Sequence, residues 1–61
     1  MTGNEVIKRL TAEGWVLLRI NGSHHRLGNK DKRTTVPVHG KRDLGKGLLS
    51  TIEKQTGVKL K

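Results

Sequence analysis

The sequence predicts an α+β fold in which a helix, a three-stranded antiparallel meander and a second helix follow one another, α-β-β-β-α. Three observations support this prediction: an Asn-Gly pair between two β-rich runs, apolar residues at helical spacing near both ends, and a third run with alternating valines. Two amphipathic helices would cover one face of the sheet and leave the other face open. With 61 residues, the chain is long enough for a single domain, residues 1–61, with a small core.

The first helix is predicted from its cap and its apolar spacing. Thr2 and Glu5 fit a capping box, in which the Thr2 hydroxyl and the Glu5 carboxylate each bind the other residue's backbone amide. Apolar residues recur at helical spacing from Val6 to Leu10, and Gly14 stands where a left-handed C-cap is expected. We therefore expect a helix of about three turns.

The first hairpin is predicted from residues 15–20, a short β-rich run that leads into Asn21-Gly22. This pair suits a two-residue type I′ turn, since both of its central residues need positive φ. The expected partners are Ile20 with Ser23, Arg19 with His24, Leu18 with His25, Leu17 with Arg26, and Val16 with Leu27. The expected inner face then carries Val16, Leu18, Ile20, His25 and Leu27.

The third strand is predicted over residues 34–39, after a polar connection at 28–33. Pro37 indicates an edge strand, where a missing amide costs no ladder hydrogen bond. The expected antiparallel register sets Leu27 beside Val36, His25 beside Val38 and His24 beside His39. The open face would then carry four basic or ionisable side chains, Arg19, His24, Arg26 and His39.

The second helix is predicted from about Lys46 to Thr56, with Gly57 ending it. Its apolar stripe consists of Leu48, Leu49 and Ile52. The amide donors at its start, together with Lys46, could hold a phosphate.

Charge narrows the functional classes. Thirteen Lys and Arg against five Asp and Glu give a net charge of +8 and a pI near 10.7, which favours a phosphate-binding surface but also fits an acidic protein partner. Trp15 is the single aromatic residue, so a platform that stacks splayed bases is disfavoured and contact with the nucleic-acid backbone is preferred. There is no cysteine and no apolar run of membrane-spanning length, which predicts a soluble cytoplasmic protein.

The three histidines are the candidate chemical groups. His25, expected among aliphatic side chains, fits a partly buried structural histidine that hydrogen-bonds the backbone. His24 is expected on the open face, where a phosphodiester can approach, and the alternative is an ordinary surface histidine. His39 is either its partner or only a strand end. A metal site is not expected, because His24 and His25 diverge and no thiolate or carboxylate joins them.

Four motifs together resemble the HicA toxin family: Gly14-Trp15, the Gly-Ser-His-His of 22–25, the Val-Pro-Val-His-Gly of 36–40, and the helix segment 44–57. The resemblance covers nearly the whole chain in the right order. It implies a fold like that of double-stranded RNA-binding domains. It also implies the toxin of a type II toxin–antitoxin system, an endoribonuclease that cleaves mRNA and is neutralised by a HicB antitoxin.

The same resemblance implies that the histidine after Gly-Ser is catalytic. That residue is His24, although some family members place their histidine one position later, which would point to His25. The expected register favours His24, because His25 faces the helices. RNA supplies its own 2′-hydroxyl nucleophile, so a histidine can do the proton transfer with no metal or other cofactor. Arg19 and Arg26, or Lys46, would stabilise the charge that develops at phosphorus.

Two other functions fit the composition. A non-catalytic module could grip double-stranded RNA through its phosphates and 2′-hydroxyls. A basic adaptor could instead bind an acidic protein. Trp15 could serve as an apolar anchor for the antitoxin, or could fold over the end of the first helix as part of the core.

Overall fold

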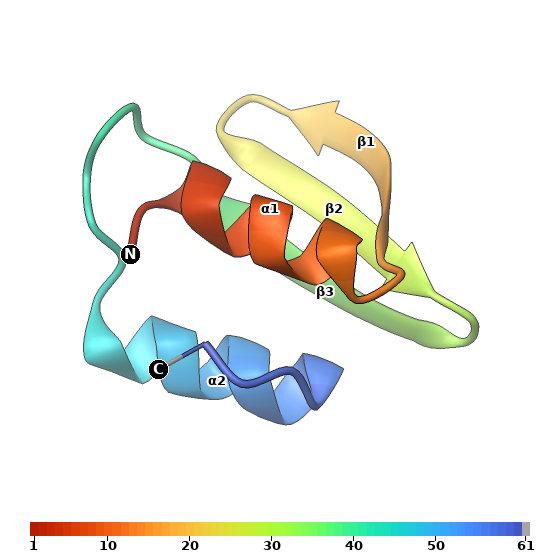
Figure 1. Cartoon of the computed structure of the whole chain (residues 1–61). Coiled ribbons are helices and arrows are strands. Elements are labelled where there is room, and N and C mark those ends of the chain that lie inside the picture. Colours follow the sequence, from red (N-terminus) through yellow and green to blue (C-terminus); the bar gives the residue numbers. More distant parts are fainter. Residues whose placement is uncertain (61) are drawn as a thin grey trace.

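The computed structural model describes residues 1–60, and it confirms the α+β class and the α-β-β-β-α order (Figure 1). The elements are α1 (Gly3–Ala12), β1 (Val16–Asn21), β2 (His24–Asn29), β3 (Lys32–Pro37) and α2 (Lys46–Thr56). The strands form one antiparallel sheet in the order β1-β2-β3, so each strand pairs only with its neighbours in the chain. Helix α1 contacts β1 and β3, and α2 packs along β3.

Both helices have the predicted ends. At α1, the Thr2 amide donates to Glu5 Oε1 (2.8 Å) and the Glu5 amide donates to Thr2 Oγ1 (3.2 Å), which completes the capping box. The hydrogen bond from the Thr2 backbone, followed by that from its side chain, lowers the pKa of Glu5. At α2, Gly57 adopts a left-handed φ of 73° and its amide donates to the Glu53 carbonyl (2.7 Å).

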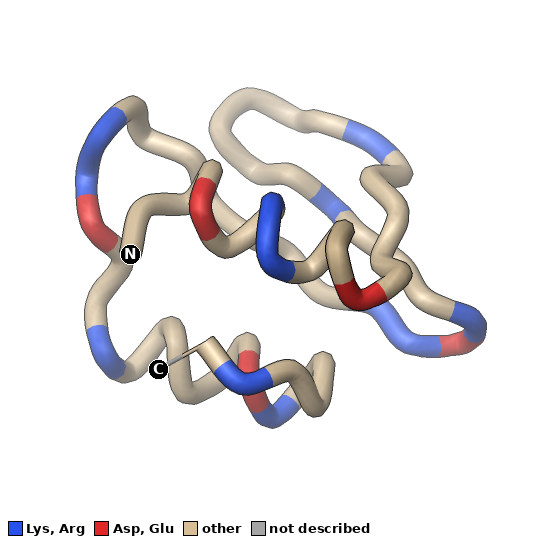
Figure 2. Tube along the Cα trace, in the orientation of Figure 1, with Lys and Arg blue, Asp and Glu red and all other residues tan. Residues whose placement is uncertain are grey.

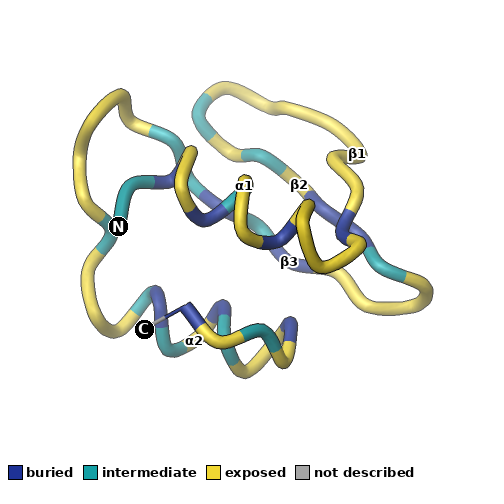
Figure 3. The backbone as a smooth tube through the Cα atoms, viewed as in Figure 1, coloured by how far each residue is buried: buried dark blue, intermediate teal, exposed yellow. Residues whose placement is uncertain are grey.

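The core lies between the helices and the β2–β3 half of the sheet (Figure 3). Its buried apolar residues are Val6, Leu10, Trp15, Leu27, Val36, Leu49, Ile52 and Leu60. Trp15 is only 3% exposed, and its amide donates to the Leu10 carbonyl (3.0 Å). Trp15 is therefore part of the core over the end of α1 and is not available as an anchor for a partner.

The first turn differs from the prediction by one residue. Gly22 and Ser23 form the two-residue loop, and Asn21 stays in the strand as the partner of His24. Gly22 has a φ of +61° whereas Ser23 does not have positive φ, a pattern found in type II′ turns. A type II′ turn needs positive φ only at its first central residue, and Gly22 provides it. Asn21 can therefore stay paired with His24 in the sheet. The partners of Arg19 and Ile20 consequently shift by two residues along β2. A shift of two residues keeps these two side chains on their expected faces.

A β-bulge in β1 overturns the rest of the predicted first hairpin. The register shifts between Leu17 and Arg19, so Leu17 pairs with Leu27 and Val16 pairs with Gly28. Leu18 is the extra residue, and its Cδ1 lies 2.8 Å from the point where a Cβ on Gly28 would stand. Leu18 and Leu17 have therefore exchanged faces relative to the expectation, as an inserted residue requires.

The third strand begins and ends two residues earlier than predicted. Lys30 and Asp31 form a two-residue turn, so residues expected in a polar connection belong to β2 and β3. Val36 pairs with His25 rather than with Leu27, and Thr34 takes the place opposite Leu27. The faces are unchanged because the shift is again two residues. The edge position predicted from Pro37 is confirmed.

The expectation that Val16, Leu18 and Ile20 are core residues is wrong. All six residues of β1 are exposed, and its four large apolar side chains are between 41% and 59% exposed. The bulge turns Val16 and Leu18 to the outer face. Ile20 keeps its inner face but stays exposed, because α2 packs on the opposite edge strand, β3 (Figure 1). No helix among residues 1–60 is both long enough and apolar enough to cross a membrane.

Candidate functional site

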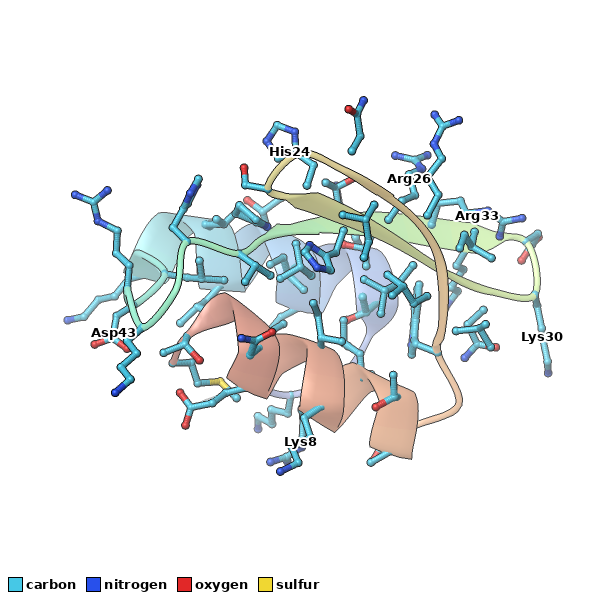
Figure 4. All side chains as sticks on the ribbon, turned by 90° about the horizontal axis from the view of Figure 1, so that it is seen from above. Lys8, His24, Arg26, Lys30, Arg33 and Asp43 are labelled. Carbon is cyan, nitrogen blue, oxygen red and sulfur yellow. The ribbon has the colours of Figure 1, made fainter. Side chains whose placement is uncertain are left out.

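The candidate site is the outer face of the sheet, which we define as the face directed away from α1. In Figure 4, His24, Arg26 and Arg33 lie on this side and Lys8 of α1 lies on the other. The three strands contain four Lys and Arg residues, Arg19, Arg26, Lys32 and Arg33, and no Asp or Glu. The sheet therefore carries uncompensated positive charge, while the acidic residues stand in helices, turns and loops (Figure 2).

Arg19 and Arg26 are direct cross-strand partners on the outer face. Like charges directly opposite each other destabilise a sheet, so this pair is unfavourable until an anion lies between or above the two side chains. Arg26 is also held by the other neighbouring strand, β3, since its Nη1 donates to Thr35 Oγ1 at 3.1 Å. The pair therefore brings two guanidinium groups together on the outer face, and Thr35 holds that of Arg26 in place.

His24 begins β2 on the outer face. It is exposed, and its partners across the sheet are Asn21 on β1 and Pro37 on β3. Arg26 follows two residues later on the same strand, so the two side chains project from the same face. The predicted position of His24 on the open face is confirmed, and its imidazole is accessible to a large substrate.

His25 points to the opposite face, as predicted. It is half-buried between its strand partners Ile20 and Val36, and its Nδ1 lies 3.2 Å from the Ser23 carbonyl oxygen. The hydrogen bond and the burial both give His25 a structural role at the first turn. Its ring is directed away from the outer-face cations.

His39 does not pair with His24, contrary to the expected register. It is exposed and follows the end of β3, where its carbonyl accepts the Arg42 amide (3.1 Å). The Val38 amide, just before it, donates to the Ser23 carbonyl (2.8 Å), which keeps this segment beside the first turn. His39 is therefore at the same end of the sheet as His24, although outside the ladder.

Lys46 lies in a different part of the molecule. It is the first residue of α2 and lines a hollow together with Met1, Asp43, Leu44 and Leu49. The Leu44 amide donates to the Met1 carbonyl (2.7 Å), and the Met1 ammonium lies 3.3 Å from Asp43 Oδ1. These contacts place Lys46 beside the start of α1, away from the paired arginines.

Arg33 also lies on the outer face, although the sequence predicts a polar connection at its position. It pairs with Gly28 on the outer face, diagonal to Arg26. Its Nη1 donates to the carbonyls of Lys30 (2.8 Å) and Lys32 (2.7 Å), which holds its guanidinium group at the second turn. Asp31 is the sequence signal that could have revealed it, because aspartate is frequent in tight turns.

No group of three or more His, Cys, Asp or Glu side chains that could hold a metal ion lies within residues 1–60. The arrangement of groups that the outer face does offer is one accessible imidazole beside two facing guanidinium groups. That arrangement can bind a phosphate and move a proton next to it.

Fold and site together define a small basic α+β domain whose outer sheet face is positively charged. Residues 3–58 match the family model described as HicA toxin of bacterial toxin–antitoxin, and the chain belongs to this HicA toxin family. It is 36% identical over 59 residues to a protein of Pseudomonas fluorescens (strain Pf0-1) named "Probable mRNA interferase HicA", with 97% of this chain and 98% of that protein covered. No solved structure matches the chain.

Proposed function

We propose that this chain is a metal-independent endoribonuclease that cleaves mRNA, with His24 as its acid–base group. The name of the Pseudomonas fluorescens relative supports cleavage of mRNA. The observation that carries the assignment of the site is the placement of one exposed histidine on the same sheet face as two cross-strand arginines. The proposed cellular location is the cytoplasm, where mRNA is found.

The proposed reaction is an intramolecular transesterification. His24 takes the proton of a ribose 2′-hydroxyl, the 2′-oxygen forms a bond to phosphorus, and the bond from phosphorus to the 5′-oxygen breaks. The departing 5′-oxygen takes a proton from solvent or from protonated His24. The products are a 2′,3′-cyclic phosphate and a 5′-hydroxyl, and acid–base catalysis of this kind contributes roughly 10²–10⁴-fold.

The guanidinium groups supply the electrostatic part of the mechanism. Arg19 and Arg26 would bind the scissile phosphate and stabilise the additional negative charge of the pentacoordinate intermediate. His39, at the same end of the sheet as His24, would bind a neighbouring phosphate. Lys46 would contact RNA only at a separate point, because it lines the hollow beside Met1.

We also propose that a HicB-type antitoxin inhibits the protein by covering the outer face. The positive charge of this face and the net charge of +8 favour an acidic partner surface. Coverage of this kind would block the approach of RNA to His24 and would neutralise the unfavourable arginine pair at the same time.

The test is cleavage of a defined RNA in EDTA by the wild type, His24→Ala and His25→Ala, with the product ends identified. We expect His24→Ala to lose at least about 10²-fold in rate while it still binds RNA. His25→Ala should keep the chemistry and lose thermal stability. Lys8→Ala is the control for a removed basic side chain, because Lys8 is exposed on the opposite side of the molecule (Figure 4).

Three outcomes would contradict the proposal. Products with 5′-phosphates, or a strict requirement for magnesium, would rule out the transesterification. Loss of cleavage only in His25→Ala would move the catalytic group to the inner face. Salt-dependent binding of double-stranded RNA without any cleavage by the wild type would instead identify a binding module.

A further inference from the structure

A cleft beside β3 is not used by the proposed reaction. It has a volume of about 250 Å³ and lies between β3 and α2. Two of its lining residues, the half-buried Leu48 and the fully buried Ile52, are apolar, and the others are polar. The residues that line it are Arg26, Arg33, Thr34, Thr35, Leu48, Thr51, Ile52 and Gln55.

The hydrogen bonds inside the cleft leave groups available for a ligand. Thr34 Oγ1 donates to Gln55 Oε1 (2.8 Å), so the Gln55 carbonyl is held against β3 and its two N–H groups can donate elsewhere. Thr51 Oγ1 donates to the Gly47 carbonyl (3.1 Å), which leaves the oxygen free to accept. The cleft therefore offers a donor and an acceptor beside the apolar side chain of Leu48.

The cleft is continuous with the proposed catalytic face through one side chain. Arg26 lines the cleft, and it also lines a second hollow of about 240 Å³ with Leu18 and Arg19. Arg33, which stands diagonal to Arg26 in the sheet, lines the cleft as well. A chain of phosphates bound at Arg19 and Arg26 would thus pass directly to the mouth of the cleft.

We propose that this cleft binds one nucleotide of the RNA substrate, next to the scissile phosphate. Its base would lie on the half-buried Leu48, with its edge against Gln55 and Thr51. Its phosphate would lie between Arg26 and Arg33. The inference rests on the proposed ribonuclease function and adds a residue set that reads the base, which makes this cleft a determinant of cleavage preference.

The first test does not depend on catalysis. Gln55 is the one glutamine in the sequence, so its side-chain amide gives the one pair of glutamine NH2 signals, which can be assigned by NMR. We expect nucleoside 5′-monophosphates, added to the full chain, to shift these signals to different extents for different bases. Inorganic phosphate should leave them largely in place. Equal shifts with phosphate and with all four nucleotides, or no shift with any of them, would overturn the proposal.

The second test fills the cleft. Thr51→Phe should occupy the space beside Leu48, and Thr51→Val should remove only the hydroxyl. We expect Thr51→Phe to raise the KM for a short RNA about tenfold or more with little change in kcat, and Thr51→Val to weaken discrimination between bases. In a His24→Ala background, Thr51→Phe should weaken RNA binding by a similar factor.

The matched controls are Thr11→Phe and Thr11→Val. Thr11 is also exposed on a helix and also donates its hydroxyl to a carbonyl in the preceding turn, that of Lys8 (3.0 Å), but it lies on α1 away from the cleft. Unchanged KM and base preference in the Thr51 variants, with cleavage still lost in His24→Ala, would refute the cleft and leave the ribonuclease standing. Absence of cleavage by the wild type would refute the ribonuclease, and the NMR titration would still decide whether the cleft binds nucleotides.

Discussion

In the two edge strands of the sheet, the apolar strand is exposed and the more polar strand is partly buried. Strand β1 reads Val-Leu-Leu-Arg-Ile-Asn and is exposed along its whole length. Strand β3 reads Lys-Arg-Thr-Thr-Val-Pro, yet it contains two buried residues, Thr34 and Val36. The difference arises because α2 packs on β3, whereas the only helix in contact with β1 is α1.

This comparison shows that hydrophobicity alone does not locate the core of so small a domain. Two short helices cannot cover three strands, so one strand is left out, and chain connectivity decides which one. Helix α2 follows β3 directly, and the Thr34–Gln55 hydrogen bond joins the two elements (2.8 Å). The apolar residues of β1 remain at the surface in spite of their strong β-propensity.

The largest expected difference in the free energy of unfolding is between a valine-to-alanine substitution on β3 and one on β1. Val36→Ala removes a fully buried side chain and should lower the free energy of unfolding by about 2–3 kcal/mol. Val16→Ala, where the side chain is 59% exposed, should change it by less than about 0.5 kcal/mol. Urea unfolding of both variants measures the contrast. Equal losses would mean that β1 is covered in solution.

Two glycines at helix starts should respond in opposite directions. A Cβ on Gly3, at the start of α1, would collide with the Pro37 carbonyl oxygen at the end of β3, so Gly3→Ala should destabilise by about 1–2 kcal/mol. Gly47, in the first turn of α2, has open space around it, and Gly47→Ala should stabilise by about 0.5–1 kcal/mol. Thermal unfolding of the two variants would show whether α1 is docked on β3 this closely.

The two hairpin turns offer a smaller contrast. Gly22 occupies the positive-φ position of the β1–β2 turn, whereas Lys30 occupies that position in the β2–β3 turn, with a φ of 57°. Lys30→Gly should relieve strain and stabilise the protein by up to about 1 kcal/mol. Gly22→Ala should destabilise it by a comparable amount. The denaturant midpoints of the two variants measure these changes. A loss of stability in Lys30→Gly would mean that Lys30 is not strained in the second turn.

The smallest expected effect is a pH dependence at the cap of α1. The hydrogen bonds from Thr2 lower the pKa of Glu5 in the folded protein below its unfolded value. The cap therefore contributes stability at pH values above the unfolded pKa and loses this contribution as the pH falls through the lowered one. Melting temperatures from pH 7 to pH 3 should fall more for the wild type than for Glu5→Gln, which keeps a hydrogen-bonding side chain without the carboxylate's charge. Parallel curves would exclude Glu5 as a source of acid sensitivity.

The features that depend on local chemistry could be predicted from the sequence. The register of β1 could not, because Leu18 is inserted as an extra residue in the bulge. The caps of both helices and the faces of His24, His25 and Arg26 follow from residue type and from the two-residue period of a strand. A register shift of two leaves those faces unchanged, which is why an incorrect register still placed His24 correctly. The bulge at Leu18 has no local sequence signal, because neither glycine nor proline stands at Leu18 or directly beside it. Arg33 escaped notice because its turn holds a lysine at positive φ, a position where glycine is the usual signal.

Trp15 gives this protein a built-in optical reporter. It is the sole aromatic side chain, it is 3% exposed, and its indole is packed in the core over the end of α1. Its fluorescence therefore follows the assembly of the core without interference from tyrosine or a second tryptophan. Because the outer face lies on the other side of the sheet, nucleic acid bound there should leave the emission nearly unchanged while unfolding shifts it to longer wavelength. Folding and ligand binding can thus be followed separately in one unlabelled sample.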